Sequence, residues 1–366
     1  MGFKCGIIGL PNVGKSTLFN ALLRTAAAQA ANYPFCTIEP NVGRVDVPDG
    51  RLATLARLSK SAKTVPTQIE FVDIAGLVRG ASKGEGLGNK FLANIREVDA
   101  VAHVLRCFEG GDVTHVEGGV DPIRDAEIVE TELMLADLDS LERRLDASTK
   151  KARGGDVESK AFVPLMEAAV AALRDGKPAR SITVAPQDQE RFRQLQLLTA
   201  LPVLYVANVD ESSAAHGNAL SEKVAERAKA EGAQHVVISA AIEAELAQLE
   251  NETERLEFLL SLGLEEAGLD RFIRKGYQLL DLITYLTTGP KETHAWTVRR
   301  GATGPEAAGV IHTDFTRGFI AAEVIPYDDF VAAGSEQAAK AAGKMRLEGR
   351  DYIVQDGDVM LFRFNV

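Results

Sequence analysis

Short apolar runs alternate with helical patterns through the first third of the chain. The runs at 3–8, 69–73 and 100–105 predict buried strands, and the apolar face that opens at Thr17 predicts a helix. The alternation returns at 201–207 and 236–238, where two further buried strands are expected. Strands separated by helices in this way are typical of a parallel α/β sheet.

Between those two α/β stretches the apolar spacing becomes helical. Met134, Leu138, Leu141 and Leu145 recur at intervals of four, three and four residues, which places them on one stripe of a helix. A glycine pair at 154–155 interrupts the pattern, and helical spacing then resumes. Two helical arms joined by a short glycine turn predict an antiparallel hairpin. Because the α/β pattern continues after it, we expect the hairpin to be inserted into the α/β domain.

The last part of the chain has short strands and turns. Apolar runs at 295–298, 319–324 and 359–364 predict strands, and a turn is expected at 356–358. We therefore predict three parts, which are an α/β domain (1–124 and 200–280), an inserted helical hairpin domain (125–199) and a small α+β domain (281–366).

Composition narrows the class of protein. Of 366 residues, 46% are hydrophobic and 25% are charged, which is ordinary for a globular protein with more than one domain. The net charge of −11 excludes general attraction to nucleic acid, so any RNA contact needs a locally basic face. Three scattered cysteines indicate neither a disulfide scaffold nor a zinc site. Since no apolar run is long enough to span a bilayer, we expect a cytoplasmic protein that does not bind membranes.

One stretch of basic residues near the C-terminus leaves two interpretations open. Acidic residues lie among the basic ones, so the stretch is either an RNA-facing patch or a solvated surface of mixed charge. The basic residues are Lys340, Lys344, Arg346 and Arg350, with Arg317 nearby.

The stretch from Gly9 to Ser16 carries the clearest chemistry. It matches G-x-x-x-x-G-K-[ST] in full, and it lies between a predicted strand and a predicted helix, as a phosphate-binding loop requires. Its glycines allow backbone N–H groups to turn toward an anion, and the helix N-terminus adds partial positive charge. Lys15 can reach the terminal phosphates, and the Ser16 hydroxyl can bind Mg²⁺. The sequence therefore predicts binding of a nucleoside triphosphate.

Two further segments complete a hydrolytic phosphate site. Asp73 begins D-x-x-G at the end of an apolar strand, a position suited to holding the metal or a water bound to it. Thr37 lies between the two motifs and is the candidate for a second hydroxyl ligand of Mg²⁺. Where a glutamine would orient the attacking water, this chain has Leu77, so no catalytic residue is assigned. His103 and His115 are considered for that role, and His115 is preferred because it lies in a polar loop bordered by glycines.

The motif expected to read the base departs from the guanine-specific pattern N-K-x-D. The strand at 201–207 leads into Asn208-Val209-Asp210-Glu211. Asn208 can meet a purine near N7 and Val209 can pack on its face, while Glu211 would crowd the edge of guanine. Asp210 lies one residue early, so a shifted guanine contact stays open, but ATP is favoured over GTP. The backbone of 239–241 is the expected last contact with the base.

These residues resemble the YchF family of Obg-related P-loop ATPases along essentially the whole chain. The most specific stretches are MGFKCGIIGLPNVGKSTLFNAL, YPFCTIEPN, FVDIAGLVRGASKGEGLGNKFL, NVDE, HTDFTRGFIAAEVIPYDDF and AGKMRLEGRDYIVQDGDVM. The resemblance implies a Ras-like G-domain with an inserted antiparallel helical hairpin, followed by a C-terminal β-grasp domain of the TGS type.

The resemblance also implies particular ligands and partners. It assigns Mg²⁺ to Ser16 and Thr37, the adenine contact to Val209, and phosphate binding to Asn12, Val13, Gly14, Lys15, Ser16 and Thr17. Related enzymes hold potassium at the position of Asn12, so stimulation by K⁺ is a hypothesis here. The implied function is an ATPase switch that acts as a monomer. Its implied partner is the ribosome, as the large subunit or the whole particle, bound through the TGS and helical domains with contact to rRNA.

Two alternative functions stay open at this stage. One is an Obg-type GTPase in ribosome assembly. The other is a nucleotide-gated RNA-binding regulatory scaffold in which hydrolysis is incidental.

Overall fold

The computed structural model describes residues 3–30, 41–74, 87–110, 119–249 and 251–365. By their contacts the residues form two compact units. The first comprises Met1–Arg44 and Glu70–Gly276, and the second comprises Val45–Ile69 and Tyr277–Val366.

The first unit is built around a six-stranded sheet with the strand order β2-β4-β1-β5-β6-β7. Strand β1 lies in the middle and pairs in parallel with β4 and β5, and the parallel pairing continues through β6 to β7. The bounds are β1 Lys4–Ile8, β2 Val42–Asp46, β4 Gln68–Asp73, β5 Ala100–Arg106, β6 Val203–Asn208 and β7 Gln234–Ile238. Every residue of β5 and β6 is buried, as continuous apolar runs in a parallel sheet predict.

Helices connect these strands, as a parallel sheet requires. Their bounds are α1 Lys15–Ala30, α3 Leu87–Ile95, α7 Ala219–Glu231, α8 Ala240–Leu246, α9 Glu252–Ser261 and α10 Gly268–Leu279. Asn218 caps α7 through its side chain, and Gly232 ends that helix in a left-handed conformation. A short 3₁₀ turn, η4 (Glu211–Ser213), follows β6.

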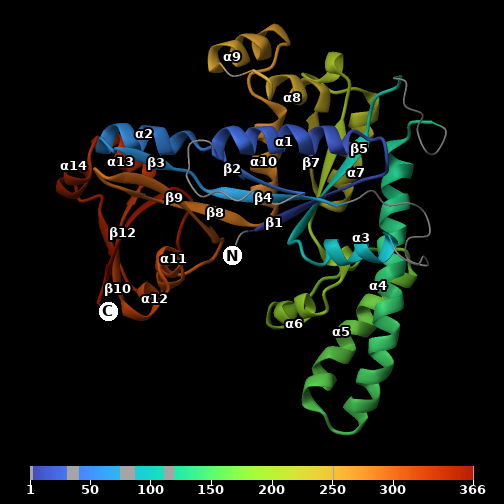
Figure 1. The fold of residues 1–366 in the computed structure, drawn as a ribbon. Coiled ribbons are helices and arrows are strands. Elements are labelled where there is room, and N and C mark those ends of the chain that lie inside the picture. Colours follow the sequence, from blue (N-terminus) through green and yellow to red (C-terminus); the bar gives the residue numbers. More distant parts are fainter. Residues whose placement is uncertain (1–2, 31–40, 75–86, 111–118, 250, 366) are drawn as a thin grey trace. The chain divides into compact units, whose positions relative to one another are not determined.

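Two long helices, α4 (Pro122–Arg153) and α5 (Val157–Arg174), come after β5 and before β6 in the chain. They lie side by side (Figure 1). Asp121 caps the start of α4, and backbone N–H groups of Gly154 and Gly155 close the turn at its end. Leu141 of α4 and Met166 of α5 belong to the same apolar core. The chain returns to β6 through η1 (Ala179–Ser181), η2 (Pro186–Asp188), α6 (Gln189–Gln194) and η3 (Leu198–Ala200).

The second unit contains a separate six-stranded sheet with the order β11-β10-β12-β8-β9-β3. Strands β8 and β9 form an antiparallel pair, β10 and β12 form another, and β12 runs parallel to β8. The bounds are β3 Lys63–Val65, β8 Leu282–Thr288, β9 Glu292–Arg299, β10 Phe319–Pro326, β11 Arg346–Glu348 and β12 Asp358–Phe364. The helices are α2 Gly50–Ser59, α11 Gly304–Ile311, α12 Thr313–Gly318, α13 Tyr327–Ala333 and α14 Glu336–Ala341.

The segment from 45 to 69 is part of the second unit, although the sequence analysis placed it in the α/β domain. Strand β3 pairs in parallel with β9 between Lys63 and Glu292. Leu52 and Leu55 of α2 share an apolar core with Leu286 and Phe330. Helix α2 thus buries its apolar surface against residues more than 200 positions further along the chain, and β3 forms its strand pairing there.

Within the part of the chain that the structure describes, no helix combines the length and apolar character needed to cross a bilayer.

Candidate nucleotide-binding site

The phosphate loop lies between the end of β1 and the start of α1, and its backbone requires glycine at two positions. Gly14 has a φ of +91°, and a Cβ there would lie 2.1 Å from Nδ2 of Asn208. Gly9 has a φ of +156°, and a Cβ there would lie 2.6 Å from the carbonyl oxygen of Val104. Asn12 also has a positive φ, 66°, which asparagine tolerates better than most residues. Glycine is therefore required at both positions, because each has a positive φ and a close neighbour where a Cβ would lie.

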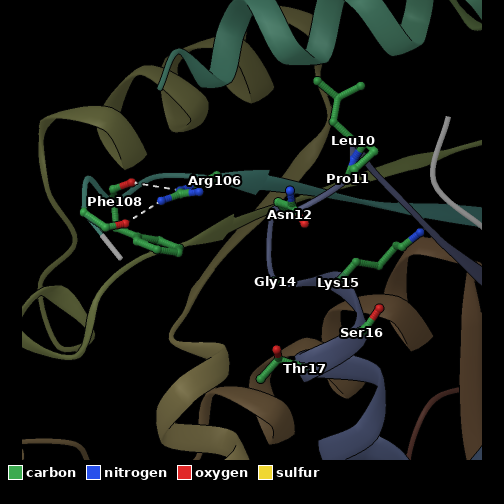
Figure 2. Close-up of a pocket in the computed structure, with 10 residues that line it drawn as sticks. Leu10, Pro11, Asn12, Gly14, Lys15, Ser16, Thr17, Arg106 and Phe108 are labelled. Atoms are coloured by element: carbon green, nitrogen blue, oxygen red, sulfur yellow. Dashed lines mark hydrogen bonds between the residues drawn. The ribbon is translucent and has the colours of Figure 1, made fainter. Parts of the chain in front are cut away.

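A cavity of about 550 Å³ opens beside this loop. Figure 2 shows that residues of the loop and of the first turn of α1 line one part of it, and residues at the end of β5 line another. The lining residues are Leu10, Pro11, Asn12, Gly14, Lys15, Ser16, Thr17, Arg106, Phe108 and Gly110. The volume is within the range usual for a small-molecule site.

The side chain of Lys15 is turned toward the end of β4. Its Nζ donates to the carbonyl oxygen of Ile74 at 2.8 Å and lies 3.8 Å from Oδ1 of Asp73. Burial lowers the pKa of the Lys15 ammonium, and the nearby Asp73 carboxylate opposes that shift. The amine is therefore held at the D-x-x-G strand by two oxygens, where a phosphate oxygen would be a stronger partner.

Two residues near the loop fit a bound Mg²⁺. Oδ1 of Asp73 is buried and accepts no hydrogen bond, since the Lys15 ammonium that faces it lies 3.8 Å away. Ser16 is exposed in the first turn of α1. No group of three acidic, histidine or cysteine side chains forms a metal cage among the described residues. Mg²⁺ commonly takes one or two protein ligands and completes its shell with phosphate and water, so this donor set fits.

Asn208 joins the phosphate loop to the start of α8. Its Nδ2 donates to the carbonyl oxygen of Val13 at 2.8 Å, and its Oδ1 accepts from the backbone N–H of Ala240 at 3.0 Å. The residue is only 3% exposed. Val209 is buried as well, and its N–H donates to the carbonyl oxygen of Ile238. The contacts of Asn208 and Val209 with a base stay predictions, because in this structure both residues bridge protein elements.

Asp210 is engaged in its own turn. Its Oδ1 accepts from the N–H of Ser213 at 2.9 Å and from Oγ of Ser212 at 2.7 Å, and these bonds lower the pKa of the Asp210 carboxyl. Glu211, the next residue, is exposed.

The other predicted site residues separate into three groups. Asn12, Ser16 and Thr17 line the cavity, whereas Val13 is buried behind the loop. Thr37, Gly76, Leu77 and His115 lie outside the described residues.

His103 lies inside the sheet. It is 4% exposed on β5, and burial together with the charges of Arg227 and Arg180 lowers its pKa to about 3. It is absent from the lining of the cavity. The structure therefore gives it no path to a bound phosphate.

Arg106 and Phe108 were not predicted as site residues, yet both line the cavity. The guanidinium of Arg106 donates to the carbonyl oxygens of Phe108 and Gly110, as the dashed lines in Figure 2 show for Phe108. The sequence did carry one signal for Arg106, which is its position at the end of a predicted strand. Arg106 ends the strand next to the phosphate-loop strand, and the carboxyl ends of parallel strands are where open α/β sheets bind ligands.

In the second unit, three of the basic residues near the C-terminus have partners. Lys344 pairs with Asp329 at 3.0 Å, Arg346 lies 3.6 Å from Glu348, and Arg350 donates to the carbonyl oxygen of Phe319. Intramolecular pairing reduces the positive charge that this surface offers to RNA.

The loop, the helix that it opens and the parallel sheet behind it define a P-loop nucleotide-binding protein. Residues 4–139 match the family described as 50S ribosome-binding GTPase. Residues 282–365 match YchF-GTPase_C, described as Protein of unknown function (DUF933).

Full-length relatives identify the family. Proteins named Ribosome-binding ATPase YchF from Haemophilus influenzae, Escherichia coli O157:H7 and Bacillus subtilis are 57%, 55% and 52% identical, each over 100% of both chains. The solved structure of the Schizosaccharomyces pombe YchF GTPase is 37% identical with a TM-score of 0.88, over 99% of this chain and 98% of that chain. The chain belongs to the YchF family. The predicted P-loop GTPase-type fold is confirmed.

Proposed function

We propose that this protein hydrolyses ATP in preference to GTP, works as a nucleotide-dependent switch and binds the ribosome. The observation that carries the proposal is the arrangement at the phosphate loop. Lys15, the exposed Ser16 and the Asp73 oxygen that accepts no hydrogen bond all belong to the loop or the strand end beside it. Relatives that match the whole chain are named Ribosome-binding ATPase YchF, which supports ATP hydrolysis and ribosome binding.

The residues of the loop have separate tasks in this proposal. Backbone N–H groups from Asn12 to Thr17 bind the phosphates, and the Lys15 amine moves from Ile74 to a phosphate oxygen. Ser16 and Asp73 would hold Mg²⁺, with Thr37 as a further ligand. When bound, the ion would neutralise negative charge on the phosphates. Asn12 would hold an activating K⁺.

The preference for ATP rests on the motif after β6. The hydrogen-bonded oxygen of Asp210 is committed to its turn, which disfavours the shifted guanine contact. Glu211 is exposed, and it stands where the pattern N-K-x-D has the shorter aspartate. Phe108 offers an aromatic face to a base in the cavity.

An Obg-type GTPase is the second candidate. The observations that favour it are the family description of residues 4–139 as a ribosome-binding GTPase and the name of the solved relative, the YchF GTPase.

Ribosome contact is proposed for two parts of the chain. These are the helical hairpin domain at 125–199 and a TGS β-grasp domain at 281–366, attached to a nucleotide-binding domain formed by 1–124 and 200–280. We further propose that the protein works as a monomer in the cytoplasm, where ribosomes are found.

Equilibrium titration with ATP and GTP, followed by phosphate-release assays, tests the nucleotide. Tighter binding and faster turnover of ATP are expected, and a clear preference for GTP overturns that part in favour of the second candidate. Co-sedimentation with ribosomes in ATP, ADP or no nucleotide tests the switch. If wild type and Lys15→Ala bind ribosomes equally in every nucleotide state, the switch is wrong and the protein is an RNA-binding scaffold.

A further inference from the structure

The end of β5 carries a cavity wall whose shape depends on one arginine. We propose that Arg106 is a positioning residue for the nucleotide base, because it fixes the ring of Phe108 as a preformed stacking surface in the cavity. The inference rests on the proposed nucleotide-binding function and adds a residue to it. No contact between Arg106 and the phosphates is involved.

Three contacts join Arg106 to the short segment that follows it. Its guanidinium carbon lies 4.6 Å from the centre of the Phe108 ring, within the range of a cation–π contact. Its Nε donates to the carbonyl oxygen of Phe108 at 3.3 Å, and its Nη2 donates to the carbonyl oxygen of Gly110 at 2.6 Å. One planar group therefore fixes the ring, the backbone of the same residue and the turn two residues later.

The burial of these residues indicates which part is rigid. Arg106 is 4% exposed, whereas Phe108 is half-buried and Gly110 is exposed with a φ of +91°. The charged group thus lies inside and the aromatic ring lies at the boundary with the cavity. A buried guanidinium holds its position because leaving its hydrogen bonds unmade is costly.

The residue between them is anchored independently. The N–H of Cys107 donates to the carbonyl oxygen of Asn208 at 2.7 Å, and Nδ2 of Asn218 donates to the carbonyl oxygen of Cys107 at 2.7 Å. Removal of the Arg106 guanidinium therefore leaves β5 and Cys107 in place. The change is confined to the segment from Phe108 to Gly110, in which the Phe108 ring is the proposed surface for the base.

A ring that is fixed before binding loses little freedom when a base stacks on it. The base gains that benefit in every nucleotide, with one phosphate or three. An inorganic polyphosphate gains nothing from it, because it reaches only the loop and the first turn of α1. This difference separates positioning of the base from a general effect on the fold.

The experiment measures Kd for ATP, ADP and inorganic tripolyphosphate with wild type and Arg106→Lys. Lysine keeps the charge but lacks the fork that reaches two carbonyl oxygens. Kd for ATP and ADP is expected to rise about tenfold, the effect of losing one good contact. Kd for tripolyphosphate is expected to stay unchanged. In hydrolysis, KM rises while kcat is maintained, since the lost contact is made equally in ground and transition states.

Arg227→Lys is the matched control. Its guanidinium also lies over an aromatic ring, 5.7 Å from the centre of Tyr205, but Arg227 does not line the cavity. It should leave all three Kd values unchanged. Phe108→Ala should weaken ATP about as much as Arg106→Lys, and the double variant should be no weaker than either, because both changes remove one surface.

Two results overturn the inference while the proposed function stands. One is unchanged ATP affinity in Arg106→Lys, and the other is an equal loss of ATP and tripolyphosphate, which indicates a general structural role. If wild type binds neither ATP nor tripolyphosphate, the proposed function itself is wrong and the inference falls with it.

Discussion

At the scale of single residues, Gly14 and Asn208 share one small space. A Cβ on Gly14 would lie 2.1 Å from the Asn208 amide nitrogen, which donates to Val13 at 2.8 Å. The second glycine of the motif is therefore required for two reasons, its positive φ and the approach of a residue almost 200 positions later. The phosphate loop depends on β6 for its shape.

Gly14→Ala should abolish measurable ATP binding. It should also lower the free energy of unfolding by more than about 1 kcal/mol, which is the cost of a positive φ alone. Calorimetric titration and urea unfolding measure the two effects. Gly155→Ala separates them, because Gly155 has a φ of +99° and open space around it. That variant should lose only the conformational part and keep ATP binding. Equal behaviour of the two variants would contradict the role of Asn208.

Asn208→Ala should lower the free energy of unfolding by about 3 kcal/mol, because it leaves the Val13 carbonyl and the Ala240 N–H buried without partners. Urea denaturation measures the loss. Asn251→Ala removes an exposed helix cap instead, and about 1 kcal/mol is expected there. ATP affinity should fall only in Asn208→Ala. If affinity is retained, the loop does not need this bridge.

Glu243 provides a prediction about pH. Burial raises its pKa to about 7 from 4.5, although the N–H groups of Leu269 and Gly268 oppose the shift. Because the folded state holds this proton more tightly than the unfolded state, the stabilisation that protonated Glu243 contributes is fully present below about pH 4.5. It is lost as the pH rises through about 7. The free energy of unfolding of wild type should therefore fall by about 3 kcal/mol over this pH interval, and Glu243→Gln should not show this fall. Urea unfolding at several pH values measures the difference. Glu245→Gln, exposed on the same helix, should leave the profile unchanged.

The sequence predicted the contiguous part of the site but not the part made by folding. Gly9 to Ser16 are consecutive, so their spacing alone indicates a phosphate loop, and the cavity includes most of them. Arg106 has no motif around it, and its role depends on the loop that follows β5. The bridge made by Asn208 was equally hidden, since the pattern N-x-x-E suggests a contact with the base.

At the scale of elements, apolar runs predicted strands well. Each predicted run at 69–73, 100–105, 236–238, 319–324 and 359–364 lies in a strand of the structure, with ends that differ by a few residues. Strands β2, β3, β8 and β11 were not predicted. Strands β2, β3 and β11 are short and carry few buried residues, so their hydrophobic pattern gives little signal. Strand β8 is longer and mostly buried, and its apolar run was missed.

Asp137 ties α4 to η3. Its two oxygens accept from the N–H groups of Leu198 and Thr199 at 2.8 Å each, and from the Thr199 hydroxyl at 2.7 Å. Asp137→Asn should lower the free energy of unfolding by about 2 kcal/mol, because an amide can accept at only one of these positions. Amide exchange at Leu198 and Thr199 should quicken. Asp139→Asn, exposed on the same helix and paired with Arg143, should change neither measurement.

At the scale of the whole molecule, the second unit is assembled from two separate pieces of chain. No local pattern could predict that 45–69 joins residues after 276, because pairing between β3 and β9 involves only three residues of each strand. Sequence reasoning assigns a segment to its neighbours in the chain unless a motif says otherwise.

Truncation after Gly276 should therefore yield a protein that aggregates. Leu52 and Leu55 would lose the partners that cover them, among them Leu286, Ile325 and Phe330. Exposed apolar surface of this kind promotes association. We expect the truncated chain to pellet after expression, and replacement of both leucines by serine to return part of it to the supernatant. Full recovery of the unmodified truncation would show that α2 needs no cover.

The same arrangement sets an order of events during synthesis. Helix α2 leaves the ribosome about 200 residues before the strands that cover it, and at roughly 5–20 residues per second that interval is about 10–40 s. Through that time Leu52 and Leu55 are open to water, while the sheet of the first unit can already pair. The nascent chain thus carries a helix with an uncovered apolar face next to an otherwise complete nucleotide-binding unit. Chaperones that bind exposed apolar helices can reach α2 during this interval.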